Sequence, residues 1–176
     1  VPFPDEINAG LTPLLEDFGS LKRVCRFLVG LNGEDAITVA AEQRVDDLLV
    51  YFALNLFHGR PRYKEQPLRL QRDIKSFFRN HTTAIEQAQA LLFSVSDPDL
   101  LLKECETAYE SGLGFLDEEH SLTLHVSQVN TLPAVLRVYV GCASNLYGDL
   151  ENADLVKIHI TSGKLSVMVY DEFNHS

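Results

Sequence analysis

The spacing of apolar residues changes once along this chain, and that change constrains the fold more than any other feature. Up to about residue 111, apolar residues recur every three to four positions, the period of an amphipathic helix. Beyond about residue 112, runs such as SLTLHVS and DLVKIHITSGKLSVMVY alternate apolar and polar residues, as half-buried strands do. We therefore predict an α+β fold: a mainly helical region over 1–111, packed with a small antiparallel sheet (strand, helix and β-hairpin) over 112–176.

Helix start and stop signals divide the first region. One or two short helices near the N-terminus are expected to end at Gly30 and Gly33, and the strongest helical pattern follows over 35–58. Asp97 as N-cap, with Pro98 at the first helical position, marks the start of another helix. These signals predict several separate helices within the N-terminal region.

The second region is expected to place polar residues on one face of its sheet. A helix over 128–147 should cross from the first strand to a hairpin that turns at Ser162-Gly163. Side chains alternate across a strand, so an apolar set facing the core leaves a polar set on the opposite face. That set supplies the candidates for acid–base chemistry or phosphate binding, which are His125, Lys157, His159 and Tyr170. A solvated sheet face, which needs polar residues of some kind, is the alternative interpretation.

Charge is distributed unevenly over the sequence. The chain has a net charge of −10, which by itself disfavours nucleic acid as a partner. Between residues 58 and 81, however, seven Lys and Arg residues stand against two acidic ones, so this segment carries +5 and the rest of the chain −15. The seven cations are Arg60, Arg62, Lys64, Arg69, Arg72, Lys75 and Arg79. They are candidates for contact with DNA phosphates, with Tyr63 as a residue that stacks on a base; a solvated helix face or internal pairing is the alternative.

Several classes of protein are disfavoured. No apolar run approaches the ~20 residues that cross a bilayer, and the N-terminus lacks the pattern of a signal peptide. Three widely spaced cysteines predict buried thiols in a reducing compartment, and we predict no metal site because no metal-ligand spacing occurs. The chain starts without Met and ends directly after a strand-like run, so we expect one compact domain cut from a longer polypeptide.

Three stretches together resemble a known family. They begin RVDDLLVYFALNLFHGRPRYKEQPLRL, LTLHVSQVNTLPAVLRVYVGCA and DLVKIHITSGKLSVMVYDEF, and the likeness spans roughly residues 14 to 173. They are similar to the DNA phosphorothioation-associated methyltransferase family, bacterial proteins encoded beside the system that replaces a phosphate oxygen of DNA with sulfur. The resemblance implies a bacterial, cytoplasmic protein of a DNA-modification pathway.

The family label also implies an S-adenosylmethionine site in a Rossmann-like domain. Such a domain needs a glycine-rich loop after its first strand, and this chain has none. The chain would then be a region outside the methyltransferase domain, with no cofactor of its own and no catalytic residue carried over from the family. We expect an accessory, non-catalytic region that contacts DNA or a partner protein through the basic stretch. Two alternatives stay open: an enzyme or ligand-binding domain that uses the sheet face for a phosphorylated or nucleotide-like ligand, and a pure assembly module.

Overall fold

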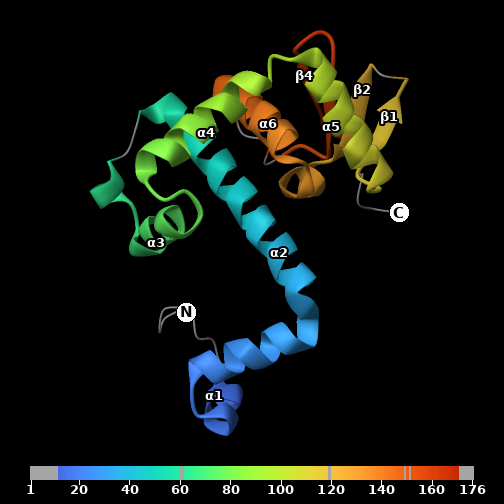
Figure 1. Ribbon diagram of the computed structural model, residues 1–176. Helices are drawn as coiled ribbons and strands as arrows, with labels where there is room; N and C mark the ends of the chain where they lie inside the picture. Colours follow the sequence, from blue (N-terminus) through green and yellow to red (C-terminus); the bar gives the residue numbers. More distant parts are fainter. Residues whose placement is uncertain (1–11, 60–61, 119, 149, 151, 171–176) are drawn as a thin grey trace. The chain divides into compact units, whose positions relative to one another are not determined.

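The computed structural model describes residues 12–59, 62–118, 120–148, 150 and 152–170 of the chain (Figure 1). The chain forms two compact units, residues 1–45 and residues 46–176. Among the described residues, helices predominate from Thr12 to Glu110 and the strands begin at Phe115, which confirms the α+β prediction. The change of secondary structure at 111–114 lies inside the second unit, because helix and sheet share one core there.

The first unit consists of helix α1 (Thr12–Phe18) and the first part of helix α2 (Leu21–Asn55). The rings of Phe18 and Phe27 pack with centroids 4.7 Å apart. Gly33 has φ 79° and ψ 161°, so the helical hydrogen bonding is interrupted at this residue and resumes directly after it. The prediction that Gly33 ends a helix is therefore confirmed, whereas Gly30 lies within the helix.

The second unit begins with the last part of α2 and, in its described residues, continues through five helical elements before the sheet. The short 3₁₀ helices are η2 (Leu56–His58) and η3 (Tyr63–Glu65), and the α-helices are α3 (Leu68–Phe77), α4 (His81–Ser94) and α5 (Pro98–Glu110). The predicted start of α5 is confirmed: the Asp97 carboxylate accepts hydrogen bonds from the backbone N–H groups of Asp99 and Leu100, and Pro98 opens the helix.

Four antiparallel strands form the sheet in the order β1-β2-β3-β4. They are β1 (Phe115–Asp117), β2 (Ser121–His125), β3 (Leu155–His159) and β4 (Leu165–Met168). Strands β3 and β4 form the predicted hairpin, with Gly163 at φ 64° in its turn, a conformation that glycine adopts without strain. Strand β1 was not predicted, because three residues are too few to show alternation.

The predicted helix over 128–147 is shorter than expected. Residues Val126–Thr131 form a 3₁₀ helix (η4), and helix α6 runs only from Ala134 to Tyr147. Pro133 stands just before α6, and a proline disfavours the helical conformation in the residue that precedes it, so the two helices stay separate.

The hydrophobic cluster between the sheet and helices α5 and α6 forms one part of the core of the second unit (Figure 1). Buried residues of α2, α3 and α4, such as Phe52 and Ile74, form another. Leu122, Leu124, Val156 and Ile158 all point to the side of α5 and α6 and are at most 2 % exposed. The predicted apolar face of the sheet is therefore the buried one. Its polar face is turned away from the helices, which places the candidate residues of β2 and β3 outside the core.

Candidate functional site

The structure describes six of the seven predicted cations, and we call these six the basic surface. Five are exposed and Arg72 is half-buried. Their positions run from the residue before η3 to the second residue after α3: Arg62, Lys64, Arg69, Arg72, Lys75 and Arg79. Arg60 lies outside the described residues. Helix α3 buries Ile74 completely, so its amphipathic pattern turns the cationic positions toward solvent.

Hydrogen bonds hold the loop of the basic surface against α3. The Tyr63 hydroxyl donates to the carbonyl oxygen of Gln71 at 3.2 Å, and Gln71 Nε2 donates to the carbonyl oxygen of Gln66 at 2.8 Å. The backbone N–H of Arg62 donates to the Glu65 carboxylate at 3.0 Å. The cations on either side of Pro67 are thus presented by one braced loop-and-helix element.

These contacts change the role predicted for Tyr63. Its ring is half-buried, with its centroid 6.0 Å from that of His81, and its hydroxyl is engaged by the fold. A tyrosine that stacks on a nucleic-acid base needs an accessible ring face. In this structure Tyr63 anchors the loop, and the cations are the groups that meet solvent.

The polar face of the sheet holds one continuous row of polar side chains. Thr123 pairs with Lys157, and Lys157 pairs with Ser166, so the three lie side by side on β2, β3 and β4. His159 Nε2 lies 2.9 Å from the Ser166 hydroxyl. The Lys157 ammonium lies 3.9 Å from the Asp117 carboxylate, an ion pair at a partly exposed position.

The candidate residues of this face do not converge on one point. His125 pairs with Leu155, which is four residues from His159 along β3, so the two histidines are separated by about 13 Å of strand. His125 Nδ1 is engaged locally, by the backbone N–H of Ser127 at 3.2 Å. Tyr170 lies beyond the end of β4, where its backbone N–H donates to the Asp154 carboxylate. An enzyme needs its acid, base and binding groups within reach of one reacting atom, and this face spreads them along the sheet.

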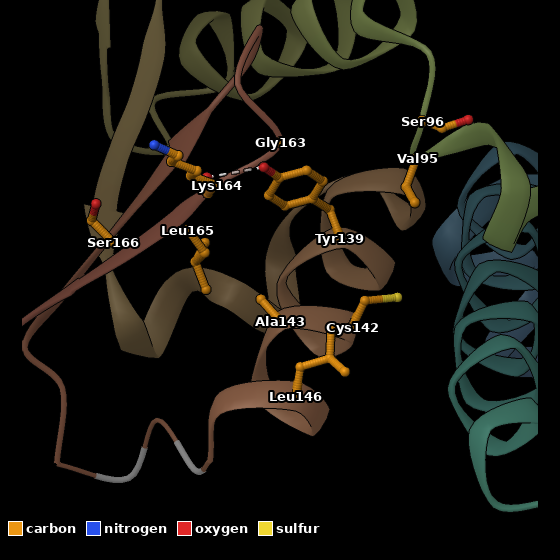
Figure 2. A pocket seen from close by; sticks show the side chains of 10 residues that line it. All are labelled: Val95, Ser96, Tyr139, Cys142, Ala143, Leu146, Gly163, Lys164, Leu165 and Ser166. Carbon is orange, nitrogen blue, oxygen red and sulfur yellow. Dashed lines mark hydrogen bonds between the residues drawn. The ribbon is translucent and has the colours of Figure 1, made fainter.

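A pocket of about 560 Å³ lies elsewhere in the second unit, and sequence reasoning missed it (Figure 2). Helix α6 forms the floor of the pocket through Tyr139, Cys142, Ala143 and Leu146. The turn between α4 and α5 supplies Val95 and Ser96, and the β3–β4 hairpin supplies residues 163–166. The residues on α6 follow helical spacing, which the sequence did show, but only the fold brings the other two segments beside them.

The hairpin wall of the pocket is tied to α6 by Tyr139. Its hydroxyl donates to the carbonyl oxygen of Lys164 at 2.9 Å and lies 3.2 Å from that of His159. Burial, together with the nearby Cys105, raises the pKa of Tyr139 to about 12, so the hydroxyl keeps its proton at neutral pH. The contact fixes the distance between the helix and the start of β4.

The cysteines behave as apolar residues in this unit. Burial raises the pKa of the Cys142 thiol, which lines the pocket half-buried, and raises that of Cys105 to about 12 with a further contribution from Glu104 and Glu106. Both thiols are therefore protonated at neutral pH. Of the three cysteines, Cys105 is fully buried, whereas Cys25 and Cys142 are half-buried. The prediction of three buried thiols is therefore right for Cys105 alone. Among the described residues, no group of three His, Cys, Asp or Glu side chains is placed to hold a metal ion.

Replacing Tyr139 by phenylalanine should destabilise the second unit by about 1 kcal/mol, because the hairpin loses its hydrogen bond to α6. Denaturant unfolding of Tyr139→Phe checks this value. Tyr109→Phe is the matched control, since Tyr109 is 50 % exposed on α5 and should change stability by less than about 0.5 kcal/mol. Equal effects of the two substitutions would show that the Tyr139 hydroxyl does not hold the hairpin.

Comparisons of the chain with family models, curated proteins and solved structures found no match. The likeness to the phosphorothioation-associated family therefore stays a prediction from the sequence. Within the part of the chain that the structure describes, no helix is both long and apolar enough to cross a membrane.

Proposed function

We propose that this chain is a non-catalytic, DNA-binding region of a bacterial, cytoplasmic DNA-modification protein, and that the basic surface contacts the phosphate backbone. In this proposal any S-adenosylmethionine is bound by a separate methyltransferase domain and not by this chain. The observation that carries the proposal is the presentation of exposed cations by one short, braced element, between residues 62 and 79.

The spacing of the cations suits a row of phosphates. Arg69 and Lys75 are six residues apart on α3, which is about 9 Å along the helix axis. A DNA duplex carries about five charges over that length. Arg62 and Lys64 on the loop and Arg79 beyond the helix extend the same cationic stretch, so contact with several phosphates at once is feasible.

The negative charge of the rest of the chain also favours binding of DNA at the basic surface. Outside residues 58–81 the chain carries −15, which repels a polyanion from its other surfaces. A partner with dense negative charge is therefore directed to the basic surface. DNA is favoured over an acidic protein because the resemblance implies a DNA-modification pathway. The sheet face is not favoured as an active site because its histidines lie apart.

Binding to duplex and single-stranded DNA across 50–200 mM salt tests the proposal. Five phosphate contacts predict a loss of affinity of roughly 500-fold over this range. In the variant Arg62→Glu/Lys64→Glu/Lys75→Glu, affinity at 50 mM salt should fall by at least about 100-fold and the salt dependence should flatten.

The matched control reverses three exposed cations elsewhere, Lys22→Glu/Arg23→Glu/Lys103→Glu. It makes the same change in net charge and should reduce affinity by less than about tenfold. Equal losses in the two variants would show that only net charge matters. Absence of binding by the wild-type chain at 50 mM salt would refute DNA as the partner.

A further inference from the structure

Strand β4 is one of the two edge strands of the sheet. In the order β1-β2-β3-β4 it pairs with β3 on one side only, within the described part of the chain. The backbone N–H of His159 donates to the carbonyl oxygen of Lys164, which makes these two residues a hydrogen-bonded pair. Because such pairs alternate along an antiparallel ladder, the N–H and C=O groups of Leu165 and Val167 point away from β3, toward the open edge.

The pocket lies along this same edge. Residues 163–166 line it from the hairpin, α6 forms its floor, and Val95 and Ser96 stand across from the hairpin (Figure 2). Leu146 and Val167 beside it are 71 % and 47 % exposed, so apolar surface of both helix and strand is uncovered here. Outward-pointing backbone groups beside uncovered apolar side chains are the features that strand addition uses: the backbone pairs, and alternate side chains enter a pocket.

The space beside β4 favours a single peptide strand over a second copy of the chain. A strand added to β4 would lie between the hairpin and the α4–α5 turn, over α6 (Figure 2). A second copy of this chain would bring its β4 with β3 already attached on the far side, so it would need room for at least two strands beside β4. A single extended peptide needs room for one strand only, which favours it for a pocket lined on its far side by Val95 and Ser96.

The lining selects the chemistry of the peptide. Leu165 and Val167 turn their side chains to the helix side of the sheet, so the peptide residues paired with them do the same and enter the pocket. The lining there is apolar or uncharged apart from Lys164, and it includes no carboxylate. The residues that enter should be apolar, and an acidic residue beside them would meet the Lys164 ammonium.

We propose that the edge of β4 and the pocket beside it form a binding site for one extended peptide of a partner protein, with alternating apolar residues and an acidic flank. β4 is four residues long, so the paired segment is about as short. The site shares no residue with the basic surface. It therefore does not depend on DNA binding, and the two proposals can fail separately.

The test is selection of peptides from a random library displayed on phage, with the intact chain as bait. The selected sequences should alternate apolar residues, carry an acidic flank and bind at one peptide per chain. Each is then followed by amide hydrogen exchange. The amides of Leu165 and Val167 should exchange quickly in the free chain and at least about tenfold more slowly with peptide bound, while the Ser166 amide, which points to β3, is protected in both states.

Two variants locate the peptide. Ala143→Leu fills the floor of the pocket and should weaken binding by about tenfold or more. Val167→Pro removes a backbone donor that β3 does not use, and it should abolish binding with little loss of the β3–β4 pairing. The triple substitution in the basic surface described above should leave peptide binding unchanged.

Three results would overturn the proposal. One is a library that yields no peptide enriched over an unrelated bait. Another is selected peptides whose binding ignores Ala143→Leu and leaves the Leu165 and Val167 amides unprotected. The third is protection of these amides that rises with protein concentration in the absence of peptide, which would assign the edge to a second copy of the chain.

Discussion

Phe52→Ala is expected to lower the free energy of unfolding of the second unit by about 3–5 kcal/mol. Phe52 is 1 % exposed, in the part of α2 that belongs to this unit, and its ring meets His81 with centroids 6.2 Å apart. Removing the ring leaves a cavity that the surrounding helices fill only in part. A loss of this size is a large share of the ~5–15 kcal/mol that stabilises an ordinary domain.

Tyrosine fluorescence in urea is a suitable measurement. The chain contains no tryptophan, and its six tyrosines all follow residue 46, so the signal reports the second unit alone. The unfolding midpoint should fall by about 2 M urea. Phe93→Ala removes the same atoms from a side chain that is 73 % exposed on α4, and it should shift the midpoint far less. Similar shifts for both would mean that Phe52 is not a core residue.

Gly114→Ala is expected to cost about 2–5 kcal/mol, from backbone strain and overpacking together. Gly114 has φ +87°, in the left-handed region, and a Cβ there would lie 2.5 Å from the carbonyl oxygen of Thr123 and 2.9 Å from Cβ of Leu124. These atoms lie on or next to the backbone of β2 and cannot rotate away. Either β2 shifts or the chain entering β1 does, and the pairing between the two strands weakens.

Gly112→Ala separates the two causes. Gly112 has φ +77°, but nothing lies within 4 Å of the position a Cβ would take. This variant should show the conformational cost alone, about 1–2 kcal/mol. Urea unfolding measures the loss of stability in each variant. The difference between the two losses is the cost of the contact between the added Cβ at residue 114 and β2. Equal losses would show that β2 has room for a side chain at residue 114.

Local signals in the sequence predicted much of this fold. The Asp97-Pro98 helix start, the Ser162-Gly163 hairpin turn and the buried faces of β2 and β3 all depend on residues near one another in the chain. The basic surface was visible for the same reason, because its cations fall between residues 62 and 79.

The features that sequence reasoning missed depend on contacts between distant segments. The pocket forms where the α4–α5 turn, α6 and the hairpin lie next to one another. The periodicity of apolar residues does not predict which distant segments become neighbours. Tyr63 was assigned to base stacking because its hydrogen bond to the Gln71 backbone cannot be inferred from the composition of a loop. The separation of His125 from His159 follows from the strand register, which alternation alone does not set.

Helix α2 crosses the division between the two units, and this bears on how the second unit is best isolated. A chain shortened to start at residue 46 would begin inside helix α2. In the full helix, the N–H groups of the first turn after residue 46 donate to carbonyl oxygens four residues earlier, and the shortened chain would lack those acceptors. Gly33 interrupts the helix already, and Glu34 and Asp35 follow it with the negative charge that a helix N-terminus favours. The natural starting point for domain dissection is therefore residue 34, twelve residues before the boundary that compactness alone suggests.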